Sequence, residues 1–478
     1  MGVIQFEVER PDLLSSAHGL SLIDFLMYDG RVVPTHARMV DGLLRCERTG
    51  GESGQMRILW PRFDHSIQVA HTTCLREQST PYSLELELAR GQISRLRNQL
   101  FAWQSAGLQT SPQLEQLVQE SHRAFRSGVL RTESPETSSG AALVAIDLAS
   151  RAADQMCQLY TEQRITYRRS RSSRLPVFLG CQLQDAPKNP EAFCGAFDAV
   201  RVATNWNQLE HADGAYEWDR LDHLVSWAQE QKLFITGGPL VDLTQDQFPE
   251  WLRIWTSDAV NMQSFVSDFV ETVVGRYVGR IRHWEVVMGA NRGGVTELDE
   301  EQRLNLVARA IQAAKQVDEH VQISIRVVQP WGEYLSQTRN RLSPIQFVDT
   351  LRRCGIRMGE INLDIRIGSI PALTLWRDAL SVSQLLDHWS FLQLPINVML
   401  SLPSTPDLSA DPEAEQRQAD WLEQTVLMCL AKERVVGIYL SNWDKEPVEG
   451  VSTALIRENG DPRPALRRLF AVFEQFWS

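Results

Sequence analysis

The sequence predicts an α/β fold in which a (β/α)8 TIM barrel follows a small N-terminal β module and a helical hairpin. Three observations support this. A chain of 478 residues is too long for one domain of ordinary size. Its first 80 residues consist of short strand patterns separated by turns, and after residue 175 strand patterns alternate with amphipathic helix patterns. The expected domains are residues 1–82, 83–174 and 175–478.

In residues 1–82, apolar and polar residues alternate, as in QFEVE and QMRILW, and this alternation is typical of half-buried strands. From Leu84 the spacing becomes helical, in residues 84–107 and again in 142–169. The turn-rich segment SGVLRTESPETSSG separates the two patterns, so a helical hairpin is expected. The basic stretch RRSRSSR then reads as a solvated linker rather than a nucleic-acid patch.

The C-terminal part contains eight apolar strand patterns, each followed by a helical pattern, which predicts βα units and a parallel sheet. Eight strands favour a closed barrel, in which functional side chains stand where the strands end. No GxGxxG or GxxxxGK[ST] motif is present, so no nucleotide cofactor is expected. The expected strands are residues 176–182, 197–203, 233–241, 281–287, 321–328, 360–367, 395–402 and 434–441.

Composition narrows the function classes. Residues 176–478 carry 28 basic and 41 acidic residues, an acidic balance that disfavours nucleic acid as a partner. No apolar run approaches the roughly 20 residues that cross a bilayer, and the N-terminus lacks a secretory pattern. The ten histidines form no HxH or HxxxH pair, so no metal site is expected. Seven scattered cysteines without CxxC favour a reduced, cytoplasmic location.

Several ordered segments resemble family 10 glycoside hydrolases, the xylanase family. Residues 197–241, FDAVRVATNWNQLEHADGAYEWDRLDHLVSWAQEQKLFITGGPLV, resemble its second and third βα units. FPEWL and RYVGRIRHWEVV continue the match in order, and VVGIYLSNWDKE followed by ENGDPRPALRRLF resembles the family's eighth strand and close. The resemblance covers roughly residues 176–478, and it implies a barrel and a saccharide ligand.

The resemblance breaks at the catalytic positions. The family's fourth strand ends in Asn-Glu, where the Glu is the general acid/base, and Met288 and Gly289 stand there in this sequence. The seventh strand of the family ends in Thr-Glu, the nucleophile, and this sequence has Leu400 or Ser401. Retaining hydrolysis needs two carboxyl groups about 5–5.5 Å apart. The resemblance therefore implies that the family mechanism is lost, as in a pseudoenzyme.

Other family positions differ as well. The His and Trp of the third unit are matched by Gly238 and Asp242, and the Gln and His of the sixth strand by Asp364 and Arg366. A tryptophan that faces a pocket suits the apolar face of a sugar ring, although tryptophan also fills cores. The expected ligand-binding residues are Asn205 (the family's Lys position), Trp206, Asn291, Trp331, Arg366 and Trp443.

A rebuilt acid–base pair is the alternative, with Glu333, Asp364 and Asp242 as the candidate catalytic residues near strand ends. Asp444 and Glu446 are further carboxylates after the eighth strand. For each of them a salt bridge at the barrel rim or a helix N-cap is the competing interpretation. Arg366 lies on a strand expected to be buried and needs an anionic partner, for which Asp364 has the right side-chain parity. Glu285 is expected deeper in the barrel, in a structural hydrogen bond.

Three functions remain open from the sequence. The first is a barrel that binds a saccharide or a related polyhydroxylated ligand without hydrolysing it. The second is an active glycosidase with relocated carboxylates. The third is a non-catalytic scaffold whose N-terminal module binds a protein partner. The identity of the sugar and the oligomeric state are not predicted.

Overall fold

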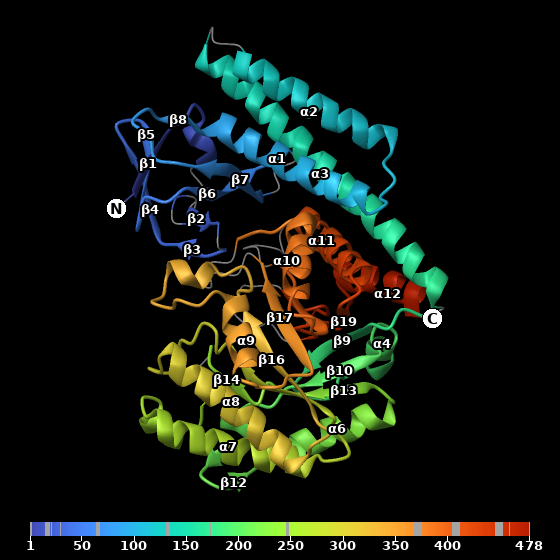
Figure 1. The fold of residues 1–478 in the computed structure, drawn as a ribbon. Coiled ribbons are helices and arrows are strands. Elements are labelled where there is room, and N and C mark those ends of the chain that lie inside the picture. Colours follow the sequence, from blue (N-terminus) through green and yellow to red (C-terminus); the bar gives the residue numbers. More distant parts are fainter. Residues whose placement is uncertain are drawn as a thin grey trace. The chain divides into compact units, whose positions relative to one another are not determined.

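The computed structural model spans residues 1–478 and describes them all except 1, 15–19, 21, 29, 64–66, 131–133, 173, 245–247, 368–374, 404–411, 445–452, 458 and 478. The chain forms two compact units (Figure 1). Unit 1 contains Met1–Arg171 together with Gly332–Arg339 and Ile370–Gln384, and unit 2 contains the remaining segments.

Unit 2 is built on a closed barrel of eight parallel strands, which confirms the predicted fold class. Each strand pairs in parallel with its sequence neighbours; β19 closes the barrel on β9, and the short β14 (Val241–Asp242) continues the pairing of β13 with β15. The barrel strands are β9 (Phe178–Leu183), β10 (Ala199–Val202), β13 (Phe234–Gly237), β15 (His283–Met288), β16 (Gln322–Val328), β17 (Glu360–Arg366), β18 (Ile396–Ser401) and β19 (Val435–Leu440).

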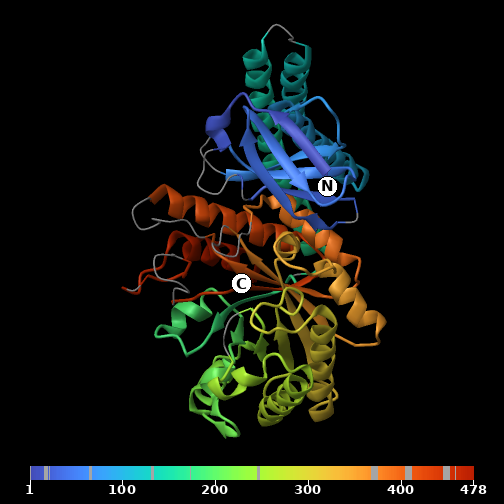
Figure 2. The same cartoon turned by 90° about the vertical axis from the view of Figure 1, so that its left-hand side faces the viewer.

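Helices cover the outside of the barrel, as Figure 2 shows from a second side. Their starts follow local chemistry: Asp299 with Gln302 and Ser343 with Gln346 form capping boxes that satisfy the first free N–H groups of α8 and α9. The helices are α4 (Pro190–Cys194), α5 (Trp206–Leu209), α6 (Asp219–Glu230), α7 (Ala259–Arg276), α8 (Glu300–Val317), α9 (Pro344–Arg353), α10 (Ala379–Ser390, which begins in unit 1), α11 (Pro412–Ala431) and α12 (Pro464–Trp477), with η2 (Glu250–Trp255) and the hairpin β11 (Glu210–Ala212) and β12 (Ala215–Tyr216) between them.

Unit 1 contains two four-stranded sheets, ordered β4-β5-β1-β8 and β3-β2-β6-β7. The predicted strands are present, and two short strands, β2 and β8, were not predicted. The alternation in β1 buries Ile4 and Phe6. The strands are β1 (Gly2–Glu7), β2 (Asp24–Met27), β3 (Val32–Val33), β4 (Thr35–Val40), β5 (Leu43–Arg48), β6 (Gly54–Pro61), β7 (Ile67–Leu75) and β8 (Tyr82–Ser83), with η1 (Pro11–Leu14) between β1 and β2.

Three helices follow: α1 (Leu84–Ser105), α2 (Pro112–Leu130) and α3 (Pro135–Arg171). The two predicted helices are present as α1 and α3, and α2, which lies between them in sequence, was not predicted, so the unit has three helices rather than a hairpin of two. The segment predicted as a turn-rich loop includes the end of α2 and the start of α3. Gly91 allows α1 to approach β7 closely, since a Cβ there would lie 1.8 Å from the His71 carbonyl oxygen. Among the described residues, no helix combines the length and the apolarity needed to cross a membrane.

The sequence assigns residues 332–339 and 370–384 to the barrel domain, whereas the structure places them in unit 1. Both segments follow barrel strands in the chain, the first after β16 and the second after β17. Strand and helix periodicity carries no information about which core a connecting segment joins.

Candidate functional site

The carboxyl edge of the barrel contains the two positions at which the family resemblance expects glutamates. At the first, Met288 is buried at the end of β15, between Asp242 of β14 and Arg326 of β16 in the strand register. Gly289 follows with a φ of 76°, and a Cβ there would lie 2.1 Å from Thr244 Cγ2. The backbone at this position therefore disfavours any larger side chain.

The second position lies at the end of β18. Ser401 stands beside Arg366 of β17 in the register, and its hydroxyl group lies 3.0 Å from that of Ser441. Leu400 is fully buried. Serine is not a base, so this contact does not activate the Ser401 hydroxyl, and neither Leu400 nor Ser401 supplies the carboxylate that the family mechanism requires.

Below this edge a buried ion cluster fills the barrel. The carboxylate of Glu285 accepts a hydrogen bond from Arg201 Nη1 at 2.6 Å and lies 2.8 Å from Arg326 Nε. The side-chain amide of Asn362 donates a hydrogen bond to the same carboxylate. Burial lowers the pKa of Arg201, and its guanidinium lies 4.7 Å from the ring centre of Tyr439. Glu285 thus has the structural role that the sequence predicts.

Asp364 and Arg366 form the predicted ion pair. Arg366 Nε lies 3.1 Å from both carboxylate oxygens of Asp364, which is buried, while 34% of the arginine side chain is exposed. The Asp364 carboxylate is the main reason that the pKa of Arg366 is raised. A carboxylate held in this way is ill suited to attack a sugar, and the exposed guanidinium is the group at this edge that remains available to a ligand.

Asp242 has a different environment. Its carboxyl group is 9% exposed and accepts hydrogen bonds from the Thr244 backbone N–H at 2.8 Å and hydroxyl at 2.7 Å. Burial raises the pKa of Asp242, and the charges of Arg366 and Arg326 only partly oppose this effect. Asp242 is therefore the carboxyl group at this edge that is best suited to hold a proton.

The structure does not place Glu333 in a reactive environment. Its carboxylate lies 2.5 Å from Arg377 Nη2 in unit 1, with 4% of the Glu333 side chain and 1% of the Arg377 side chain exposed. The expectation that Glu333 and Asp364 flank one substrate receives no support, because each carboxylate is occupied by an arginine of its own unit. Glu446 lies outside the described residues.

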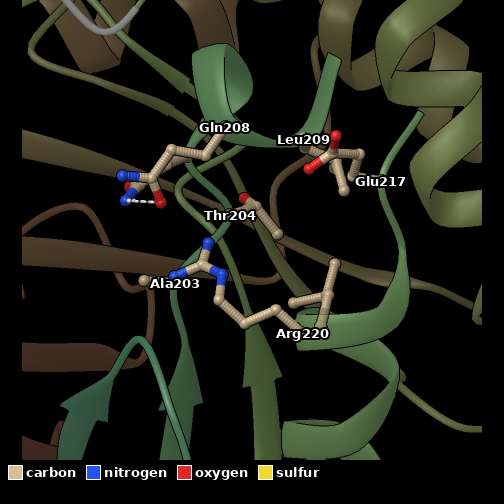
Figure 3. Close-up of a pocket in the computed structure, with 8 residues that line it drawn as sticks. Ala203, Thr204, Gln208, Leu209, Glu217 and Arg220 are labelled. Carbon is tan, nitrogen blue, oxygen red and sulfur yellow. Dashed lines mark hydrogen bonds between the residues drawn. The ribbon is translucent and has the colours of Figure 1, made fainter. Parts of the chain in front are cut away.

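Asn205 lines a small cavity at the end of β10, with a volume of about 10 Å³, which is room for about one water molecule. The Asn205 side-chain amide donates to Gln208 Oε1 at 3.2 Å. Figure 3 shows the Gln208 amide and the Arg220 guanidinium reaching into this cavity from α5 and α6. Its lining residues are Ala203, Thr204, Asn205, Gln208, Leu209, Glu217, Arg220 and Leu221.

Two of the expected ligand-binding residues have structural roles. Trp206 is buried, stacks on Phe269 with 4.2 Å between ring centres and donates to Glu210 at 2.7 Å, so its ring packs against other residues of the chain and its expected contact with a ligand stays a prediction. Asn291 bonds the backbone of Val328 twice, donating at 2.9 Å and accepting at 3.2 Å. These bonds give Asn291 a structural role, and its expected contact with a ligand hydroxyl stays a prediction. Trp331 is half-buried after β16.

A second cavity, of about 90 Å³, opens between the ends of β9 and β19. Trp443 forms part of its wall, although the ring also packs edge-on against Phe193 and Phe197. Most of the wall is polar, and sequence reasoning missed Gln182, Ser441 and Asn442, whose position directly at strand ends was the available signal. The lining residues are Gln182, Leu183, Gln184, Asp185, Ala186, Ser441, Asn442, Trp443 and Asp444.

Within the described ranges, no three His, Cys, Asp or Glu side chains form a group that could hold a metal ion. The polar groups at the barrel edge include amides, hydroxyls, the partly exposed guanidinium of Arg366 and the two aspartates of the second cavity. This set offers hydrogen bonds in both directions, as recognition of a polyhydroxylated ligand requires.

The fold and the polar carboxyl edge define a (β/α)8 barrel protein with the usual location for a ligand site. Residues 182–329 match the family model of glycosyl hydrolase family 10, which confirms the family 10 resemblance of the barrel. Two solved structures share the fold. Xylanase 10B of Thermotoga maritima is 17% identical with a TM-score of 0.52, covering 64% of this chain and 98% of that one. Penicillium canescens endo-1,4-beta-xylanase XylE is 16% identical with a TM-score of 0.51, covering 66% and 97%.

Sequence relatives include enzymes and a regulator. Endo-1,4-beta-xylanase 3 of Hypocrea jecorina is 37% identical over 82 residues, 17% of this chain and 23% of that enzyme. Endo-1,4-beta-xylanase of Agaricus bisporus is 22% identical over 251 residues, 50% of this chain and 69% of that enzyme. Anti-sigma-I factor RsgI6 of Acetivibrio thermocellus is 20% identical over 276 residues, 57% of this chain and 33% of that protein. The match with the Hypocrea enzyme thus spans about a quarter of its length.

Proposed function

We propose that this protein binds a saccharide at the carboxyl edge of its family-10-type barrel and does not hydrolyse it by the family's retaining mechanism. The observation that carries the proposal is the pair of strand ends at Met288–Gly289 and Leu400–Ser401, which have no carboxylate. A side chain that cannot exchange a proton or attack carbon cannot replace either glutamate. General acid catalysis alone typically contributes 10²–10⁴-fold.

Electrostatics support the same proposal. The transition state of glycoside hydrolysis has oxocarbenium character, so a hydrolase places negative charge beside the reacting carbon. Here the register places Arg326 beside Met288 and Arg366 beside Ser401. Their carboxylate partners, Glu285 and Asp364, are already bound in ion pairs. Positive charge at both positions opposes a cationic transition state but not the binding of neutral hydroxyl groups.

The relatives support saccharide binding and allow for the loss of catalysis. Several are named xylanases, and the solved xylanase 10B of Thermotoga petrophila is in complex with xylobiose. The anti-sigma-I factor relative bears the name of a regulator rather than of a hydrolase. A barrel of this type that recognises sugar without cutting it is consistent with both kinds of relative.

Isothermal titration of the full chain with β-1,4-linked xylo-, cello- and manno-oligosaccharides tests binding, and a reducing-sugar assay on the same mixtures tests hydrolysis. We expect heat with at least one series and no release of reducing ends. Asp444→Asn, at the wall of the 90 Å³ cavity, should weaken binding about tenfold, as for one lost hydrogen bond to a charged group. Glu319→Gln, in the exposed turn before β16, is the matched control.

If no oligosaccharide gives heat, the proposal that the protein binds a saccharide is contradicted. If reducing ends are released, the proposal that it does not hydrolyse the saccharide is contradicted. Gly289→Glu separates a missing group from a remodelled site, since the left-handed backbone and the contact with Thr244 oppose the new side chain. We expect that this variant gains no activity.

A second candidate function, an active glycosidase with a relocated acid, is favoured by one observation, the raised pKa of Asp242. A buried carboxyl group with a raised pKa is better suited than an ordinary aspartate to protonate a leaving group. If hydrolysis is detected, Asp242→Asn should abolish it. Activity that persists in a variant with Asp242, Asp364 and Glu333 all neutralised would show that the reactive centre lies elsewhere.

We also propose a reducing, cytoplasmic location. All seven cysteines are free thiols, and burial raises the pKa of Cys46 and Cys429 to about 12, which keeps these two thiols unreactive. Fractionation of cells with a compartment-specific thiol probe tests this location. Labelling together with secreted proteins would contradict it.

A further inference from the structure

Unit 1 contains two short segments that are remote from the rest of it in sequence, Gly332–Arg339 and Ile370–Gln384. The first includes the helical turn η3 (Glu333–Ser336), and the second includes the start of α10. Both directly follow barrel strands in the chain.

Apolar contacts attach the first segment. Tyr334 and Leu335 are buried and form one cluster with Val32 of β3, against which Leu26 of β2 also packs. A buried tyrosine and leucine bring enough apolar area to matter, since one such side chain contributes about 1.5–3 kcal/mol when it is fully buried. The first segment therefore completes a small core on the sheet that contains β2 and β3.

A buried ion pair joins the first segment to the second. Glu333 and Arg377 lie 2.5 Å apart and are almost fully buried. A second buried pair is nearby, in which Arg57 of β6 binds Asp24 of β2 at 2.6 and 2.7 Å. The two pairs interact electrostatically: the Glu333 carboxylate acts on Arg57, and Asp24 acts on Arg377.

Arg95 of α1 holds the second segment. Its guanidinium donates to both carboxylate oxygens of Asp378 at 2.8 Å and to the Ser381 hydroxyl at 2.8 Å. Asp378 in turn accepts from the Ser381 backbone N–H at 2.8 Å, which caps the start of α10. Gln99, one turn along α1, accepts from Gln384 at 3.1 Å. One face of α1 is thus matched to the first turns of α10.

The charges in this region balance. Arg57, Arg95 and Arg377 are paired with Asp24, Glu333 and Asp378. His71 of β7 lies among them, and burial together with the three guanidinium groups lowers its pKa, so it adds no charge. Arg95 keeps only 10% of its side chain exposed. Without the second segment, this guanidinium would lose its anionic partner, which is costly for a buried charge.

We infer that the N-terminal module binds these two segments of its own chain as its partner, through the Tyr334–Leu335 contact, the Glu333–Arg377 pair and the Arg95–Asp378 pair. The module therefore holds residues 333–336 and 377–384, which follow β16 and β17 in the chain. This inference does not depend on the proposed function. If the N-terminal module also binds a separate protein, it must use another surface, because residues of the same chain already occupy the one formed by α1, β2 and β3.

Hydrogen–deuterium exchange of the full chain, read by peptide, tests the inference. In Arg95→Gln we expect amides of residues 379–384 to exchange at least about tenfold faster, while the sheets of β1–β7 and the barrel strands keep their protection. Arg38→Gln is the matched control, since it removes the same group from an exposed pair with Glu47 in the same module. It should leave every peptide unchanged.

Two further variants keep the test decisive. Arg95→Lys retains the positive charge but not the bidentate hydrogen bonding to Asp378, so the exchange rate of residues 379–384 should lie between those of the parent and of Arg95→Gln. Glu333→Gln alters the other pair and should expose residues 333–336 preferentially. Unchanged exchange in both segments would overturn the inference. So would faster exchange that appears only together with exchange of the whole module, because the pairs would then stabilise unit 1 in general rather than hold the segments.

Discussion

In the barrel, Arg201 and Arg326 share the single carboxylate of Glu285, whereas in unit 1 three arginines have three carboxylates. The barrel cluster joins strands of one parallel sheet, β10, β15 and β16, whereas the cluster in unit 1 includes the Arg95–Asp378 pair, whose members are 283 residues apart in sequence. Where two arginines share one carboxylate, a single substitution of that carboxylate breaks both ion pairs. Where each arginine has its own carboxylate, a substitution breaks one ion pair and leaves the others in place.

The largest effect is expected for Glu285→Gln. The variant leaves two buried guanidinium groups without an anion, so the free energy of unfolding should fall by about 3–5 kcal/mol. Urea denaturation of the full chain measures the change, and Glu250→Gln, in an exposed pair with Arg253, should show none. A loss as small as that of the control would mean that water or other polar groups already neutralise Arg201 and Arg326.

Asp378→Asn breaks one separate pair, and we expect a loss of about 2 kcal/mol at neutral pH. Burial would raise the pKa of Asp378, but the Arg95 guanidinium outweighs it and holds the pKa well below its ordinary value. The stabilisation is present above the unfolded pKa and is lost as pH falls through the folded one. The deficit of the variant should therefore shrink below about pH 4. A deficit that is constant with pH would contradict the ion pair.

The stability loss of Asn291→Ala, which breaks an uncharged buried contact, can be compared with the losses at the two ion clusters. It removes both hydrogen bonds to the Val328 backbone and leaves a buried N–H and C=O unpaired, so a loss of about 1–3 kcal/mol is expected. Thermal unfolding measures it, and the oligosaccharide titration on the same variant should be unchanged. Loss of ligand heat without loss of stability would instead support the predicted contact of Asn291 with a ligand.

The smallest effect has the opposite sign. Burial raises the pKa of Asp242, so the native state loses stability as pH rises from about 4 through the folded pKa. Asp242→Asn retains an acceptor for Thr244 without the charge and should be more stable than the parent at pH 7, by less than about 1 kcal/mol. The gain should vanish near pH 4. A variant that is less stable at pH 7 would show that Asp242 is ionised and stabilising.

Periodicity and residue chemistry predicted the barrel well. All eight expected strands lie within about two residues of the observed ones or contain them, because hydrophobic burial in a parallel sheet leaves continuous apolar runs. The Asp364–Arg366 pair followed from the parity of two residues on one strand. Helix α2 was not predicted, and the segment 127–140, rich in Ser, Thr and Gly, was predicted as a loop although it includes the end of α2 and the start of α3.

The sequence by itself determined the barrel, the family resemblance and the absence of a carboxylate at the two strand ends where that resemblance expects the family's glutamates, since each depends on residue type and local spacing. Only the tertiary structure decided what the remaining candidates do. Glu333 pairs with an arginine 44 residues away, and Trp206 packs against Phe269 in a core. Such outcomes depend on which distant groups meet in a low-dielectric interior, where a buried charge must find a counter-charge and a buried ring must find neighbours.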